Sequence, residues 1–198
     1  MQSISDVYLY KTSCDQIITS PEKWLGDSGN NIPMIGWTAL IFCNHMINSG
    51  QVKDGFVMKC SKYSKIVNYF VQGYRILPDN PSNQSEITAD EYLNDILNNS
   101  YHGFTIGPAD TMDSFSPLGY LDTLLNFNQR SFGLGWIANS LTENKYANYF
   151  NTAKTQFQQN NIAAIQNTLQ TVLQEVNQDS SSNLTSEAYA LLRYNIAR

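Results

Sequence analysis

The chain has 198 residues, of which 42% are hydrophobic and 12% aromatic, a composition typical of a folded globular protein. Only 15% of the residues are charged, 22 are asparagine, and the net charge of -5 offers no basic face for nucleic-acid phosphates. No run of 18 apolar residues is present, so we predict no membrane-spanning helix.

The cysteines and the N-terminus bear on the cellular compartment. Cys14, Cys43 and Cys60 permit at most one internal disulfide, and the sequence identifies neither the pair nor the redox state. Three buried thiols are the other interpretation. The N-terminus lacks the basic and apolar segments of a signal peptide. We therefore expect a cytoplasmic protein, or a piece of a longer secreted chain with an artificial start at Met1.

The N-terminal half, residues 1–115, is predicted to be a helical domain of unknown type. Residues 1–20 favour a short extended segment, and Pro21 favours the start of a short helix. The run that begins at Pro33 predicts a central helix, because its apolar side chains would surround most of a helical cylinder. These side chains are Met34, Trp37, Leu40, Ile41, Cys43 and Met46.

Two more helices and a short strand complete this half. Residues 61–74 show helical spacing of apolar residues, and Thr88–Glu91 is a capping box that opens a third helix. Gly103–Ile106 is a possible strand within a segment rich in glycine and proline, which we take as the boundary between the halves.

The C-terminal half, residues 116–198, predicts an up-down four-helix bundle, because short loops separate four amphipathic segments. The third segment shows the pattern best, with Ile162, Ile165, Leu169, Val172 and Val176 spaced three and four residues apart. Another capping box, Ser140–Glu143, opens the second segment. The predicted fold class is therefore mostly α, with a short β element in the N-terminal half.

Several phrases of the C-terminal half follow one another in a familiar order. They are Leu134–Ile137 (LGWI), Ala153, Ala163–Ala164, Leu173–Val176 and Leu184–Asn195 (LTSEAYALLRYN). This order resembles a helical module, related to the FIMAH domain, of large secreted and surface proteins of Bacteroidetes- and Chlorobi-type bacteria. In such modules the last helix usually continues beyond the YN pair, whereas this sequence ends soon after it. The resemblance covers residues 118–198 and implies a non-catalytic appendage of an exported multidomain protein.

The candidate catalytic residues are Cys43, His45 and His102, with Asp110 and Asp113 as an alternative carboxylate pair. On a helix, Cys43 and His45 would face roughly 200° apart and would not hydrogen-bond. His102 precedes the possible strand, which is how papain-like thiol hydrolases place their base. A buried structural thiol and solvated or capping carboxylates are the competing interpretations.

A metal site could draw on Cys43, His45, Cys60, His102, Asp110 and Asp113, but no CxxC or HxxxH spacing occurs. We therefore predict neither a metal nor a cofactor. Abundant aromatic and amide side chains favour a carbohydrate or other surface ligand, with Trp37, Tyr101, Asp110 and Asp113 as candidate binding residues.

The function that we favour from sequence is a non-catalytic interaction or spacer module. It would bind a protein partner, or a second copy through its helices, and be secreted or on the cell surface if the resemblance holds. A hydrolase in the N-terminal half, of the Cys43/His102 or Asp110/Asp113 type, is the alternative.

Overall fold

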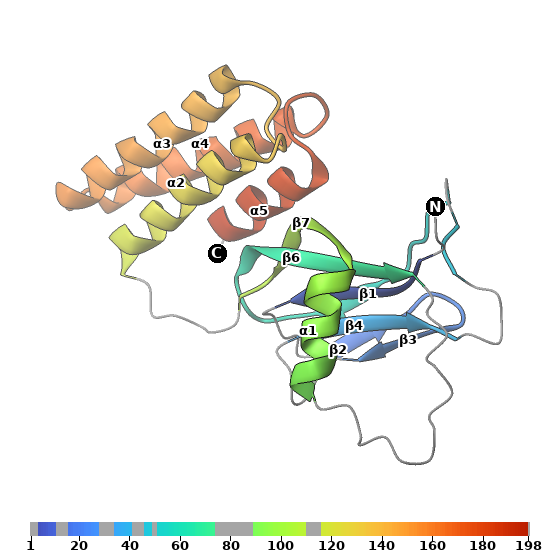
Figure 1. Ribbon diagram of the computed structural model, residues 1–198. Coiled ribbons are helices and arrows are strands. Elements are labelled where there is room, and N and C mark those ends of the chain that lie inside the picture. The colour runs from blue at the N-terminus through green and yellow to red at the C-terminus, as the bar shows by residue number, and fades with distance from the viewer. Residues whose placement is uncertain are drawn as a thin grey trace, which may run out of the picture. The chain divides into compact units, whose positions relative to one another are not determined.

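The chain divides into two compact units in a computed structural model that describes residues 4–10, 16–27, 34–40, 46–48, 51–73, 89–109 and 116–197. Met1–Lys62 with Val67–Asp110 form the first unit, and Tyr63–Ile66 with Thr111–Arg198 form the second. We call them the sheet unit and the helical unit after their main elements (Figure 1).

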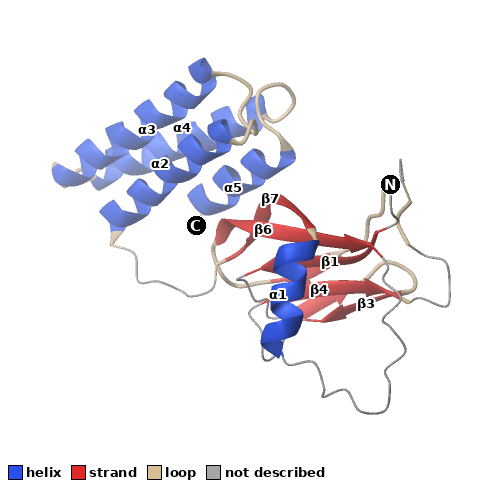
Figure 2. Cartoon of the chain, in the orientation of Figure 1, coloured by secondary structure: helices blue, strands red, loops and turns tan. Residues whose placement is uncertain are grey.

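In the described part of the chain, the sheet unit has one five-stranded sheet in the order β3-β4-β1-β6-β7 (Figure 2). Its strands are β1 (Ile4–Tyr10), β3 (Trp24–Asp27), β4 (Met34–Ala39), β6 (Ser64–Gly73) and β7 (Tyr101–Pro108). The pairs β3/β4, β4/β1 and β1/β6 are antiparallel. A second, two-stranded sheet joins β2 (Gln16–Thr19) to β5 (Val57–Lys59).

One face of the five-stranded sheet carries an aromatic cluster. Leu9, Ile35 and Trp37 point to this face from β1 and β4, and the ring of Trp24 joins them from β3. Phe56 packs edge-on against both tryptophans, with ring centroids 5.2 Å from Trp24 and 5.6 Å from Trp37. This face is therefore buried although no helix of the described residues covers it.

The opposite face is covered by α1 (Ala89–Asn99), which lies across the strands (Figure 1). Ile96 of α1 is wholly buried against Tyr8, Met34 and Phe70, which come from β1, β4 and β6. Because side chains alternate between the faces of a strand, Met34 and Ile35 enter different cores.

The predicted helices at Pro21, over Met34–Asn48 and over residues 61–74 are wrong. Trp24–Asp27, Met34–Ala39 and Ser64–Gly73 are strands β3, β4 and β6. A strand that is buried on both faces carries apolar residues at successive positions, so its sequence loses the alternation that marks a half-exposed strand. The runs MIGWTA and KIVNYFV of this chain therefore resemble buried helices. The extended N-terminal segment, the helix after Thr88 and the strand near Gly103 are confirmed.

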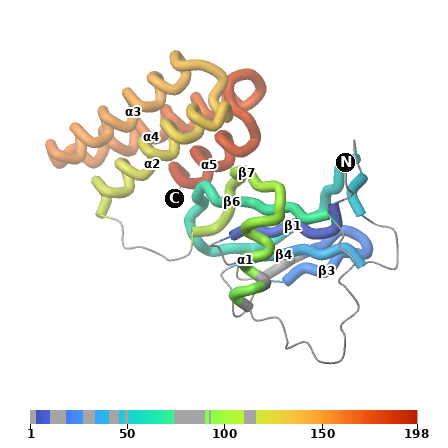
Figure 3. Tube along the Cα trace, viewed as in Figure 1, coloured from blue at the N-terminus to red at the C-terminus, as the bar shows by residue number. Residues whose placement is uncertain are grey.

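The helical unit contains α2 (Pro117–Gly133), α3 (Ser140–Gln158), α4 (Ile162–Asp179) and α5 (Ser186–Ile196), all in segments predicted to be helical (Figure 3). Each begins at a side chain that accepts a backbone N–H of its first turn: Ser116, Asn139, Asn161 and Thr185. Asn139 caps α3, one residue before the predicted Ser140.

The four helices share one core, in which α3 contributes Tyr146 and Phe150 and α4 contributes Val172 and Val176, all wholly buried. The connections α2–α3 and α4–α5 are joined by an antiparallel bridge between Ile137 and Leu184. Reciprocal backbone bonds flank it, from Ala138 N–H to Asn183 O at 2.9 Å and from Thr185 N–H to Trp136 O at 2.9 Å.

The predicted fold class, mostly α with an up-down four-helix bundle, is thus wrong. The sheet makes this a protein of both α and β structure. Within the helical unit, α2, α3 and α4 have 17, 19 and 18 residues but α5 has only 11, and a β bridge joins two of the connections. In the described ranges, no helix combines the length and the apolar character that crossing a membrane requires.

The apolar residues at helical spacing from Ile162 to Val176 form the seam of α4. A stability prediction follows from their packing. Val172→Ala removes buried methyl groups from the core, and partly buried Leu169→Ala removes more, so each costs roughly 1–4 kcal/mol of unfolding free energy. Urea denaturation measures the loss. The matched control is exposed Gln174→Ala on the same helix, which should change stability by less than about 0.5 kcal/mol. Equal stability of all three variants would contradict the assignment of this seam to the core.

A second prediction concerns Gly36 in β4. A Cβ atom there would lie 2.9 Å from Cδ1 of Tyr8, a residue that is only 5% exposed. Gly36→Ala should therefore cost about 1–3 kcal/mol through overpacking. A Cβ at Gly133, the last residue of α2, meets nothing within 4 Å, so Gly133→Ala should be neutral or stabilise by up to about 1 kcal/mol. Thermal unfolding of the two variants compares these expectations directly, and a stable Gly36→Ala protein would contradict the packing of Tyr8.

Candidate functional site

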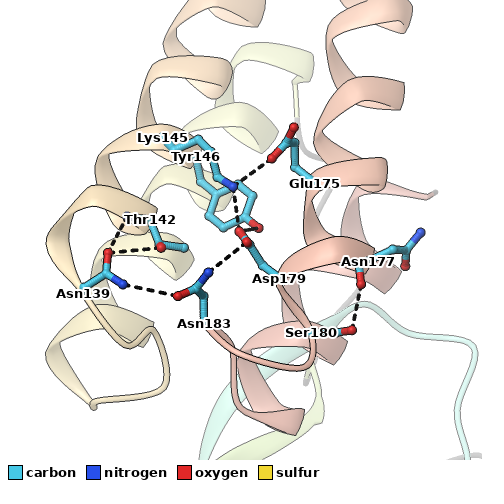
Figure 4. Close-up of polar contacts among 9 residues, drawn as sticks. All are labelled: Asn139, Thr142, Lys145, Tyr146, Glu175, Asn177, Asp179, Ser180 and Asn183. Carbon is cyan, nitrogen blue, oxygen red and sulfur yellow. Dashed lines mark hydrogen bonds and ion pairs between the residues drawn. The ribbon is translucent and has the colours of Figure 1, made fainter.

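The helical unit holds a cluster of polar side chains around Asp179, the last residue of α4 (Figure 4). Its Oδ2 atom accepts hydrogen bonds from the Tyr146 hydroxyl at 2.6 Å and from the Lys145 ammonium at 2.7 Å. Its Oδ1 atom accepts one from Asn183 Nδ2 at 3.0 Å. We call Lys145, Tyr146, Glu175, Asp179 and Asn183 the Asp179 cluster.

Helix geometry brings these groups together. Glu175 and Asp179 are four residues apart on α4 and so share one face of that helix. Lys145 of α3 reaches both of them, with Nζ 2.8 Å from Glu175 Oε2. Lys145 Nζ also lies 5.2 Å from the ring centroid of Tyr146. The cluster therefore connects α3 to the final turn of α4.

The backbone at the end of α4 closes around the same residue. The carbonyl of Asp179 accepts the N–H groups of Ser182, Asn183 and Leu184 at 3.1, 2.9 and 3.2 Å. Asn183 is thereby placed so that its side chain reaches the Asp179 carboxylate, and its Oδ1 accepts a bond from Asn139 Nδ2 at 3.3 Å. Asn139 in turn caps α3 by accepting the Thr142 N–H at 2.9 Å. The cluster and this cap form one network across three segments.

The charges of the cluster reinforce one another. Burial alone would lower the pKa of Lys145, but its hydrogen bonds to Asp179 and Glu175 raise that pKa above 10.5. Burial alone would raise the pKa of Asp179, but bonds from Lys145, Tyr146 and Asn183 bring that pKa below 3.8. Burial and the bond to Asp179 raise the pKa of Tyr146. At neutral pH the cluster therefore holds a carboxylate, an ammonium and a neutral phenol.

This arrangement suits a structural role better than catalysis. Asp179 is 8% exposed, and both of its carboxylate oxygens are occupied by donors from the protein itself. Neither Lys145 nor Tyr146 can act as a base near neutral pH, because the pKa of each is raised. The geometry indicates that the cluster holds the end of α4 against α3.

The sequence contains one signal for this cluster. A carboxylate in the last turn of a helix opposes the helix dipole, which favours cations there. Asp179 therefore needs a compensating partner, and Lys145 supplies it from another helix. The partner itself could not be found from sequence, because 34 residues separate the two.

Of the predicted catalytic and binding residues, Cys43, His45, Asp110 and Asp113 lie outside the described residues, as does Cys14. Their proposed roles stay predictions. The third cysteine, Cys60, is half-buried, and its Sγ accepts the Lys62 N–H at 3.4 Å. Within the described ranges, no group of three or more histidine, cysteine or acidic side chains could hold a metal ion.

The structure places the other three predicted residues apart. Trp37 is 3% exposed on β4, on the face of the aromatic cluster. His102, on edge strand β7, packs on the opposite face, with its ring centroid 5.9 Å from that of Phe70. Strands β1 and β6 separate β4 from β7, a spacing of about 14 Å. Tyr101 is 76% exposed beside His102. Trp37 and His102 therefore do not line a common site.

Comparison of the chain with protein-family models, with curated proteins and with solved structures gave no match. The FIMAH-like resemblance of residues 118–198 accordingly stays a prediction.

The Asp179 cluster makes the stability of the chain depend on pH. Because the pKa of Asp179 is lower in the folded than in the unfolded state, its stabilisation is present above pH 3.8 and is lost as pH falls through the folded-state pKa. Asp179→Asn should cost about 1.5–3 kcal/mol at pH 7 and should reduce the acid-dependent loss of stability. Urea denaturation between pH 7 and pH 2 measures both effects.

Asp122→Asn is the matched control. Asp122 also pairs with a lysine, Lys154, but its side chain is 59% exposed, so this substitution should cost no more than about 1 kcal/mol. If the Asp179→Asn and Asp122→Asn proteins lost stability with the same pH profile as the unsubstituted chain, Asp179 would not be the controlling carboxylate.

Proposed function

We propose that the chain is a non-catalytic interaction or spacer module of an exported bacterial protein. The observation that carries this proposal is the closure of the Asp179 cluster, in which the charged groups bond to one another rather than face a substrate. A helical unit fixed in this way is suited to presenting a surface in a constant shape. The resemblance of residues 118–198 to the FIMAH-like modules supports the same role and the exported location.

The surface that we propose for interaction is the apolar rim of the α2–α3 connection. Leu141, in the first turn of α3, is 81% exposed, and Phe132, near the end of α2, is 39% exposed. The connection between them is held in place, because Trp136 and Ile137 donate their N–H groups to Ser131 O at 2.8 and 3.3 Å. Two large apolar side chains therefore stay exposed to water on either side of a fixed connection. Burying them against the surface of a partner would be favourable.

The partner that we propose first is a second copy of the chain. Each copy carries a net charge of -5, but only 15% of its residues are charged, so the repulsion that opposes contact between two apolar rims is modest. Carbohydrate is the second candidate ligand, favoured by the exposed ring of Tyr101, since sugars stack on aromatic faces. Binding through Tyr101 would use the sheet unit and would not depend on Leu141.

The test is the mass of the full chain as a function of concentration, measured by sedimentation equilibrium. We expect the mass to rise toward that of a dimer, and Leu141→Glu to weaken association at least about tenfold, because a charge replaces a buried apolar contact. Exposed Asn151→Glu on the same helix adds the same charge about 15 Å from Leu141 along the helix axis and should leave association unchanged. A monomer at every concentration would exclude self-association, and equal weakening by both variants would exclude the apolar rim.

A further inference from the structure

Two buried polar side chains of α2 each carry an atom that the described residues leave without a hydrogen-bond partner. Asn128 and Ser131 are both wholly buried, and the atoms are Asn128 Oδ1 and Ser131 Oγ. Buried polar atoms are rarely left unpaired in folded proteins, because each costs the free energy of losing its bonds to water. These two side chains lie one helical turn apart and so occupy the same face of α2.

The orientation of the Asn128 amide is fixed by its other end. Asn128 Nδ2 donates to the Glu143 carbonyl oxygen at 2.9 Å and approaches Glu143 Oε1 at 3.3 Å. Exchanging the amide nitrogen and oxygen would place an oxygen against two acceptors, so Oδ1 must be the atom that points away from Glu143. Asn128 Oδ1 is therefore the end of the amide that has no partner among the described residues.

The surroundings exclude bulk solvent from these atoms. Leu124 precedes Asn128 by one turn and is 1% exposed, and Ile137, from the α2–α3 connection, is also 1% exposed. The Ser131 carbonyl already accepts the N–H groups of Trp136 and Ile137, so the connection folds back over this end of α2. A partner for the two atoms must therefore be small enough to lie inside the core.

We propose that one internal water molecule binds between Asn128 Oδ1 and Ser131 Oγ. Residues three apart on a helix are neighbours on its surface, so side-chain oxygens at these two positions can both lie within hydrogen-bond reach, about 2.8 Å, of one water. The water donates one proton to Asn128 Oδ1 and exchanges a hydrogen bond with Ser131 Oγ. A calcium ion would need at least about six oxygen ligands, whereas this site offers two neutral ones, so water fits and a metal does not.

This water would form part of the structure of the α2–α3 junction, and the inference does not depend on the proposed interaction function. The Asn128 amide would then connect Glu143 of α3 on one side to the water and Ser131 on the other. Through Ser131, the same network reaches the backbone bonds that seat Trp136 and Ile137.

A crystal structure of the full chain at about 1.5 Å resolution or better tests the site directly. We expect a density peak at hydrogen-bond distance, about 2.7–3.2 Å, from both Asn128 Oδ1 and Ser131 Oγ. A Ser131 hydroxyl that instead bonds directly to Asn128 or to a backbone carbonyl, with no water beside it, would overturn the proposal.

The stability of the Ser131→Ala protein is a second test, because the expected direction of its change differs with and without the internal water. If the water is present, Ser131→Ala removes one of its partners and should raise the unfolding equilibrium constant about five- to tenfold. If Ser131 Oγ has no partner, the same substitution relieves an unpaired buried hydroxyl, and the constant should stay the same or fall. Ser140→Ala, at an exposed serine at the start of α3, is the control and should change the constant by less than about twofold.

Discussion

The helical unit depends on a carboxylate at an unfavourable place. Asp179 lies at the C-terminal end of α4, where the helix dipole repels negative charge, and it is largely buried. Three donors, from Lys145, Tyr146 and Asn183, offset both costs. Since Asn183 also meets the cap of α3, the same carboxylate fixes the α4–α5 connection and the start of α3. The core packing and the bridge between Ile137 and Leu184 rely on those positions.

The two halves of the chain differ in how much of their structure the sequence predicts. In the helical unit the information is local, because seam residues recur at helical spacing and caps such as Thr185 stand at the helix starts. In the sheet unit, Met34 and Ile35 are both buried but on opposite faces. Only the position of α1 on one side and Phe56 on the other explains this pattern. Helical spacing is therefore reliable where one face is exposed and misleading where none is.

The polar sites follow the same division. Cysteine, histidine and paired aspartates attract attention in a sequence because they can carry chemistry, and Trp37 because it can stack on a sugar. Trp37 instead fills the aromatic cluster of the sheet unit, whereas Lys145, Tyr146 and Asp179 form the most connected polar group of the helical unit. Lys145 and Tyr146 are unremarkable in sequence, and their association with Asp179 depends on the antiparallel packing of α3 and α4. Contacts of this kind become visible only in three dimensions.

The bridge between Ile137 and Leu184 has a consequence for how the unit forms during synthesis. It joins segments 47 residues apart, whereas the contacts of α2 with α3 and of α3 with α4 form between neighbours in sequence. Chains emerge from the ribosome N-terminus first, so these two helix pairs can associate before Leu184 exists. Until then the bridge cannot form, and the apolar seam of α4 lacks its contact with α5. A nascent chain that pauses before Leu184 would thus expose this seam to chaperones or to neighbouring chains.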